Sequence, residues 1–173
     1  VSQYFAEEVQ SDYKRHIPEK SYSIIHNWID TDLFQFEEKS PDDRKRILTI
    51  KPFSGEKYGN DLTTKLILEL SHKDFFNDLS FAIYGDGPDF DYINNPLKKF
   101  SNVQLHKTFL PQSQIAQLHK KYGIFIATTR WDSQGVSRDE AMASGLVPLT
   151  NAVSAIPEFT DSTCAILARR SEE

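Results

Sequence analysis

The chain has 173 residues, of which 39% are hydrophobic, and this is enough for the core of one domain. Its net charge of −5 excludes a broad basic surface, so nucleic acid is not an expected partner. No apolar run approaches the roughly 18–20 residues that span a bilayer, and no signal-peptide pattern opens the chain. The single cysteine, Cys164, excludes an intrachain disulfide and is expected to be a small buried hydrophobe in a reducing compartment.

The N-terminal part of the chain is polar and predicts little regular structure. Residues 1–20 are expected to form a helix, 23–26 a short strand, 27–34 a turn and loop, and 37–45 a charged linker.

A regular alternation of strands and helices follows. Short apolar runs between turn residues predict strands, and apolar residues spaced by three or four positions predict helices. The expected strands are 46–50, 79–84, 103–106, 124–128, 146–150 and 163–167. The expected helices are 61–72, 89–99, 113–121, 138–144 and 156–159.

Short buried strands that alternate with helices predict an α/β fold, a Rossmann-like parallel sheet with helices on both faces. Ligands of such sheets bind beyond the carboxyl ends of the strands. The loops that follow the strands are therefore the expected site, namely 51–59, 85–88, 107–111, 128–138 and 151–157.

The segment 131–145 carries the most informative pattern. It places Asp132 and Glu140 eight residues apart, with a small-residue turn between them that opens a helix. Such a turn is a natural anion site, because free backbone N–H groups and the helix dipole face the ligand. The two carboxylates can accept hydrogen bonds from sugar hydroxyls, so the segment predicts a binding pocket for a nucleotide sugar. Two other interpretations stay open: Ser137 and Glu140 have capping-box spacing, and Asp132 could be an exposed loop acid.

Three cations and two glycines in neighbouring loops are further candidates. Lys51 and Lys57 could neutralise a diphosphate leaving group or could be solvated surface lysines. Arg130 fits either a phosphate contact or a structural ion pair. Gly85 and Gly87 would let a ligand approach the backbone, although a tight turn with Pro88 at the first position of a helix also explains them.

No metal site is expected. The five histidines do not cluster at metal-ligand spacing, and one cysteine gives no zinc signature. The two Asp-x-Asp triplets, 30–32 and 89–91, are rejected as metal sites. The first lies before the α/β alternation, and the second lies at a helix start, where acids are favoured.

The order of these motifs resembles the C-terminal, donor-binding domain of a GT-B-fold glycosyltransferase of the retaining family-4, or group 1, type. In that family an acid and a glycine-rich turn precede Glu-Ala-Met-Ala-x-Gly. Residues 132–145 are similar, with Asp132 where the family usually has Glu. Further similar segments follow in the family's order at 25–34, 51–57, 83–88, 109–111 and 147–158, so the resemblance covers about residues 22–168.

The resemblance implies roles for individual residues. Lys51 and Lys57 would bind the donor diphosphate, Asp132 the donor sugar, and Glu140 the ribose, as the catalytic set. No metal or other cofactor is implied. Further donor-binding residues would be Gly85, Gly87, Phe109, Leu110, Arg130, Gly135, Val136 and Ser137, with the base near Phe109 and Leu110.

The resemblance also implies how the chain is divided and what it does. Residues 1–21 would be the tail of a preceding domain, 22–168 the nucleotide-sugar-binding domain, and 169–173 a truncated C-terminal end. The implied reaction is retaining transfer of a glycosyl group from a nucleotide-diphosphate sugar to an acceptor hydroxyl, in bacterial polysaccharide or glycoconjugate biosynthesis. The implied location is the cytoplasm.

Acceptor-binding groups and any membrane contact would lie on a missing N-terminal half of the same chain. We therefore expect this fragment alone to bind donor weakly and to transfer little. Two alternatives stay open. One is a GT-B-like nucleotide-sugar epimerase, and the other is a non-catalytic α/β module that docks a partner.

Overall fold

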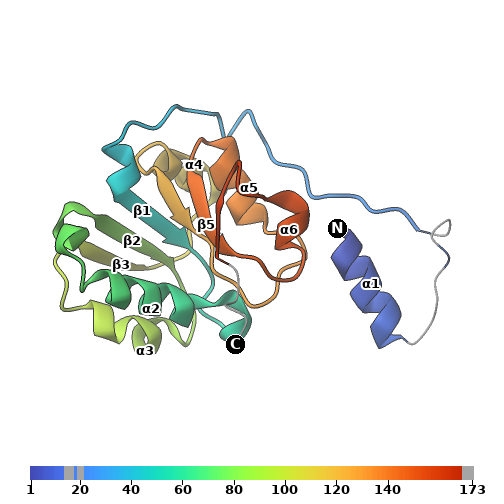
Figure 1. The fold of residues 1–173 in the computed structure, drawn as a ribbon, viewed down its shortest axis with the longest axis horizontal. Helices are drawn as coiled ribbons and strands as arrows, with labels where there is room; N and C mark the ends of the chain where they lie inside the picture. The colour runs from blue at the N-terminus through green and yellow to red at the C-terminus, as the bar shows by residue number, and fades with distance from the viewer. Residues whose placement is uncertain (14–17, 19–21, 169–173) are drawn as a thin grey trace.

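A computed structural model describes residues 1–13, 18 and 22–168 (Figure 1). The strands of this part of the chain form one parallel sheet in the order β3-β2-β1-β4-β5-β6. The order reverses between β1 and β4, which makes the edge between them the switch point of the sheet. The strands are β1 (Arg46–Ile50), β2 (Ser80–Gly85), β3 (Val103–Lys107), β4 (Ile124–Ile126), β5 (Val147–Asn151) and β6 (Ile166–Ala168).

Helices connect the strands and cover both faces of the sheet. In Figure 1, α2 and α3 lie in front of the sheet, and α4 lies behind it. The α-helices are α1 (Gln3–Asp12), α2 (Asn60–Leu70), α3 (Phe90–Asn94), α4 (Gln112–His119), α5 (Val136–Ala143) and α6 (Ile156–Phe159). Short 3-10 turns are η2 (Asp43–Lys45), η3 (Glu56–Tyr58), η4 (Asp74–Asp78) and η5 (Asn95–Leu97). The predicted fold class, a Rossmann-like α/β sheet, is confirmed.

Two hydrophobic cores lie on opposite faces of the sheet, because successive strand residues point to opposite sides. On one face Ile47 packs with Phe81 of β2 and with Ile67 of α2. On the other face Leu48 packs with the strand residue Phe125 and with Ala141 of α5. Burial on both faces explains why the central strands read as continuous apolar runs.

Three local predictions are wrong. Residues 23–26 form no strand, and Ile25 is 78% exposed, so no neighbouring strand or core buries this apolar run. Cys164 is exposed rather than buried, because it lies in the turn before β6. Helix α3 begins at Phe90 with Asp89 as its N-cap, so Pro88 precedes the helix instead of opening it.

The N-terminal helix is shorter than predicted and lies beside the sheet domain, on the right of Figure 1. It spans Gln3–Asp12 of the expected 1–20, and residues 14–17 and 19–21 lie outside the described part of the chain, as does the expected end at 169–173. Among the helices that the structure describes, none is long and apolar enough to cross a membrane.

Candidate functional site

The loops that follow β1 and β4 meet at the switch point and form one continuous surface. The backbone N–H of Arg130 donates to the Lys57 carbonyl over 2.9 Å, and the Thr129 hydroxyl donates to the same carbonyl over 3.0 Å. The Thr128 hydroxyl donates to the Gly59 carbonyl over 2.8 Å. Asn151, at the end of β5, joins this surface by accepting from the Thr129 N–H over 2.8 Å. The edge predicted from the strand pattern is therefore built from three neighbouring strand ends.

Lys51 lies beneath this surface rather than on it. Its side chain is 8% exposed, and its Nζ donates to the carbonyls of Tyr58, over 3.2 Å, and of Thr128. Burial lowers the pKa of Lys51 to about 8, which the nearby Asp132 opposes and the nearby Arg138 reinforces. The structure thus places a partly desolvated cation under the junction of the two loops.

Lys57 occupies the same loop but is exposed to solvent. Its Nζ lies 4.9 Å from the centroid of the Tyr58 ring, and its backbone carbonyl is held by Thr129 and Arg130. The backbone of Lys57 is therefore fixed, while its ammonium group remains accessible to a ligand at the switch point.

Arg130 forms a two-pronged ion pair with Asp61 at the start of α2. Its two terminal nitrogens lie 2.6 and 2.7 Å from the two Asp61 oxygens, and one of them also donates to the Glu56 carbonyl over 2.9 Å. Hydrogen bonding to this guanidinium lowers the pKa of Asp61. Of the two interpretations left open, the structure shows the ion pair, and the phosphate contact stays a prediction.

Gly85 and Gly87 provide space for the loop after β1. A Cβ on Gly85 would lie 1.9 Å from the Lys51 carbonyl oxygen, and one on Gly87 would lie 2.2 Å from the Phe53 carbonyl oxygen. The chain's own backbone therefore occupies the space that these glycines leave. Their packing role is clear, and their contact with a ligand stays a prediction.

The turn before α5 opens the helix differently from the predicted capping box. Gly135, with a φ of +91°, is the N-cap, and no side chain caps the helix. Ser137 and Glu140 lie inside the helix, so the capping-box interpretation is wrong. The N–H groups of Gly135, Val136 and Ser137 find no hydrogen-bond acceptor within the described part of the chain. Such a helix start attracts an anion, because unpaired donors and the positive end of the helix dipole coincide there.

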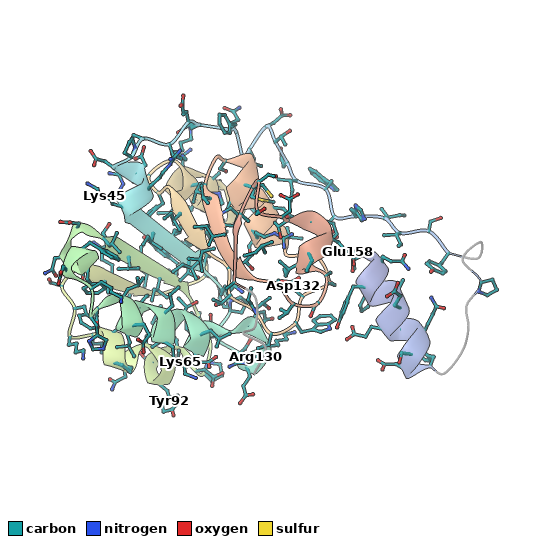
Figure 2. The ribbon with its side chains drawn as sticks, viewed as in Figure 1. Lys45, Lys65, Tyr92, Arg130, Asp132 and Glu158 are labelled. Carbon is teal, nitrogen blue, oxygen red and sulfur yellow. The ribbon has the colours of Figure 1, made fainter. Side chains whose placement is uncertain are left out.

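Asp132 lies just before this turn, on the side of the domain that faces α1 (Figure 2). Its Oδ1 accepts from the backbone N–H of Gln134 over 3.1 Å, and its carbonyl accepts from Ala155 over 3.3 Å. Its Oδ2 accepts no hydrogen bond from any residue that the structure describes. One carboxylate oxygen thus orients the side chain, and the other is available to a hydroxyl.

Glu140 lies on α5, one helical turn after the first residue, Val136, and is 7% exposed. Its Oε1 accepts from the Gln112 side chain over 3.2 Å. Burial raises the pKa of Glu140, and the neighbouring Asp139 adds to this effect. Gln112 opens α4 directly after the loop that holds Phe109 and Leu110, so the structure brings Glu140 close to the loop predicted to hold the base.

Two residues of the site were not predicted from the sequence. The amide of Gln134, 3% exposed, accepts from the Asn27 N–H over 2.7 Å and donates to the Asn27 carbonyl over 2.9 Å. Arg138, 1% exposed, donates to the Gln134 carbonyl over 2.6 Å and pairs with Asp139. No local sequence pattern could have predicted the contact between Gln134 and Asn27, because the two residues are 107 positions apart.

The described residues contain no group of three His, Cys, Asp or Glu side chains placed to hold a metal ion. Three of the four acids in the two Asp-x-Asp triplets bind the protein itself. Asp30 accepts from the N–H groups of Asp32 and Leu33, Asp89 accepts from Gly55, and Asp91 pairs with Lys107.

Solved structures of glycosyltransferases share this fold. The C-terminal domain of the glycosyl transferase group 1 family protein LpcC from Francisella tularensis is 17% identical, with a TM-score of 0.65 over 82% of this chain and 80% of that chain. WaaG, a glycosyltransferase involved in lipopolysaccharide biosynthesis, is 16% identical, with a TM-score of 0.73 over 98% of this chain and 48% of that one. The lipopolysaccharide outer core galactosyltransferase WaaB is 18% identical, with a TM-score of 0.71 over 97% and 47%.

The fold that this chain shares with these structures is the Rossmann-like C-terminal domain of GT-B glycosyltransferases. The family described as glycosyl transferases group 1 matches residues 30–163, most of the chain. The chain belongs to this family. It spans about half the length of WaaG and WaaB, and it matches the C-terminal domain of LpcC. No curated protein sequence matches it at a significant level.

Proposed function

We propose that this domain binds a nucleotide-diphosphate sugar and supports retaining transfer of its glycosyl group to an acceptor hydroxyl. The observation that carries the proposal is the start of α5. Its N–H groups have no acceptor among the described residues and lie, in sequence, between Asp132 and Glu140, at the switch point of a group 1 glycosyltransferase sheet. A nucleotide-diphosphate sugar needs two kinds of group in its binding site: hydrogen-bond donors for its phosphates and hydrogen-bond acceptors for its hydroxyls.

The positive groups of the site have one role in this reaction, which is to stabilise the leaving group. When the glycosyl bond breaks, negative charge develops on the leaving diphosphate. Fixed cations and helix dipoles stabilise such charge most when they are already in place. We assign this role to Lys57, to the buried Lys51 and to the N–H groups at the start of α5. The chemistry of this set needs no metal ion, because the chain itself provides the positive charge.

The two carboxylates are assigned to the hydroxyl groups of the donor. Asp132 has one oxygen without a partner among the described residues, beside the helix start, which suits the transferred sugar. Glu140 lies deeper, beside the loop of Phe109 and Leu110, which suits the ribose of a nucleotide whose base contacts that loop.

We further propose that the acceptor-binding groups lie on another part of the protein, since the chain spans about half of its longer structural relatives. WaaG and WaaB are named for lipopolysaccharide, and this supports a role in bacterial glycoconjugate biosynthesis. On this account the chain by itself binds donor weakly and transfers little, and any membrane contact lies outside it. Detectable transfer by this chain alone would contradict that part of the proposal.

A thermal-shift measurement with UDP, GDP, TDP and ADP tests the proposal, because a ligand that binds only the native state raises Tm. We expect a rise with one nucleotide, which identifies the base, and loss of the rise in both Lys57→Ala and Glu140→Ala. A rise that survives both substitutions would place the nucleotide elsewhere. The absence of a rise with all four at millimolar concentration would contradict donor binding by this domain.

A further inference from the structure

Residues 131–135 form the loop that contains Asp132. Near both of its ends this loop contacts the N-terminal part of the chain. We propose that Trp131 and Gln134 are positioning residues. Through them, the helix α1 and the extended segment around Asn27 set the place of Asp132 and so tune binding of the donor sugar. The inference rests on the proposed function for the identity of the ligand. The coupling between the N-terminal part and the loop 131–135 is argued from contacts within the chain.

The first contact joins Trp131 to α1. The indole N–H of Trp131 donates to both carboxylate oxygens of Glu8, over 2.8 and 2.9 Å. The Phe5 ring packs edge-on against the Trp131 ring, with centroids 6.1 Å apart. An aromatic packing contact and a charge-assisted hydrogen bond together fix both the position and the tilt of the indole ring.

A second carboxylate, from the sheet domain, holds the N-terminal end of α1. Glu158, on α6, accepts from the N–H groups of Gln3 and Tyr4, over 2.8 and 2.6 Å. It stabilises the helix start, where backbone donors are otherwise unpaired and the dipole is positive. Because Glu158 and Trp131 both belong to the sheet domain, α1 is held at two points beside Asp132. Figure 2 shows Glu158 and Asp132 on this side of the molecule.

The second fastening joins Gln134 to the backbone of Asn27. One buried amide meets both the N–H and the carbonyl of Asn27, as a neighbouring strand would. Arg138 supports the loop from within by donating to the Gln134 carbonyl, and its guanidinium lies 5.8 Å from the centroid of the Phe159 ring. Both ends of the loop are therefore held by hydrogen bonds to the N-terminal part of the chain.

The coupling should affect the sugar more than the nucleotide. Asp132 is the only assigned ligand side chain inside the loop 131–135, and its Oδ1 accepts from the backbone N–H of Gln134. Glu140 is held by Gln112, and the backbone of Lys57 by Thr129 and Arg130. Displacement of a hydrogen-bonding group by about 1 Å is enough to lose its contribution.

The test uses substitutions in the N-terminal part, so that the loop itself stays unaltered. Glu8→Ala removes the acceptor of Trp131, and Asn27→Pro removes the N–H that donates to Gln134. The matched controls are Glu7→Ala, on the same helix with the same loss of charge, and Asn27→Ala, which keeps the backbone N–H. The first readout is hydrogen–deuterium exchange of the Gln134 amide, the one backbone N–H of residues 131–136 with an acceptor among the described residues, compared with exchange in β1, β2 and β3.

We expect exchange of the Gln134 amide to become at least about fivefold faster in Glu8→Ala and Asn27→Pro, since each variant loses a contact that holds the loop in which Gln134 donates to Asp132. Exchange in the three strands and in both controls should not change. Unchanged loop exchange would overturn the proposal whether or not a nucleotide binds. Faster exchange throughout the domain would overturn it as well, because the contacts would then be general structural supports.

The second readout is the ratio of the Kd of a nucleoside diphosphate to that of its sugar, with UDP and UDP-glucose, GDP and GDP-mannose, TDP and TDP-glucose, and ADP and ADP-glucose as probes. We expect the two substitutions to leave the diphosphate Kd within about twofold and to abolish the gain in affinity from the sugar. An equal loss for both ligands would overturn the positioning of the sugar. If the unaltered protein binds none of the probes, the proposed function fails, and loop exchange alone decides the coupling.

Discussion

The loops after β1 and β4 meet at the same edge of the sheet, but they use their polar groups in opposite ways. In the first loop, Lys51 donates to backbone carbonyls, and the Gly85 and Gly87 turn is filled by that loop's own backbone. In the second, one oxygen of Asp132 and the N–H groups at the start of α5 have no partner within the residues described. A protein stabilises itself by pairing such groups, so groups left unpaired at a predicted ligand edge are candidates for recognition.

The comparison assigns the first loop to structure and charge, with Lys57 as its accessible contact, and the second loop to recognition. Substitutions of groups that are paired within the protein should then change stability, and those of Lys57 and of the start of α5 should change binding. Each prediction below tests one side of this division.

The largest effect is expected from Gly135→Ala. Its φ of +91° strains any other residue, and the new Cβ would lie 2.9 Å from the Arg138 guanidinium. Because the start of α5 would have to move, we expect nucleotide binding to weaken by more than about 100-fold, measured by calorimetric titration. Gly55→Ala is the control: its φ is +112° but its Cβ would meet nothing within 4 Å, so it should lower Tm and leave affinity nearly unchanged. Equal losses of affinity in the two variants would break the comparison.

The next effect is expected from Lys57→Ala, which removes the exposed cation of the first loop. A charge-assisted hydrogen bond contributes about 1.5–3 kcal/mol, so the Kd for the nucleoside diphosphate should rise by about ten- to 100-fold. Lys57→Arg keeps the charge and should recover most of the affinity, and Tm without ligand should not change. Full affinity in Lys57→Ala would mean that the first loop does not contact the diphosphate.

A third prediction concerns the pH dependence that Lys51 produces. Because burial lowers its pKa to about 8 from an ordinary 10.5, the unfolded chain holds this proton more tightly than the native one. The cost of burying the charge is therefore complete below about pH 8, and stability from this group rises as pH increases from about 8 to 10.5. Nucleotide affinity should fall as the pH rises above about 8, because the native protein then loses a cation.

The measurement is the difference between the unaltered protein and Lys51→Met, in both unfolding free energy and Kd, from pH 7 to 10. The variant should lack the part of each pH profile that Lys51 contributes. Superimposable profiles would mean that Lys51 does not titrate in this range.

The smallest effect is expected from Arg130→Ala. Its ion pair with Asp61 is more than a third exposed on the arginine side, so solvent screening limits its contribution to about 1 kcal/mol or less. We expect a slightly lower Tm and a nucleotide Kd within about twofold. A loss of affinity as large as that of Lys57→Ala would show that Arg130 leaves Asp61 to bind phosphate.

The fold could be predicted from the sequence to the degree that local pattern determines it. The apolar run 46–50 and its flanking polar residues predicted β1 with the bounds that the structure has, because a central strand is buried on both faces. The run 23–26 has a similar local pattern, but no sheet edge lies beside it, and only tertiary structure decides that.

The candidate site divides in the same way. The acids and the small-residue turn in the segment 131–145 can be recognised in the sequence, because they lie close together along the chain. The capping-box interpretation was wrong because Gly135 starts the helix two residues before Ser137. The contacts of Trp131 with Glu8 and of Gln134 with Asn27 join residues more than 100 positions apart, so spacing carried no information about them.

The most direct test of the account is a map of amide chemical-shift changes in the labelled protein as UDP, GDP, TDP and ADP are added in turn. The account predicts that one nucleotide shifts the N–H signals of Gly135, Val136 and Ser137 most, followed by those of the loops 51–59 and 107–111. Shifts confined to other surfaces, or none at saturating concentration with any of the four, would contradict the claim that the start of α5 receives the donor phosphate.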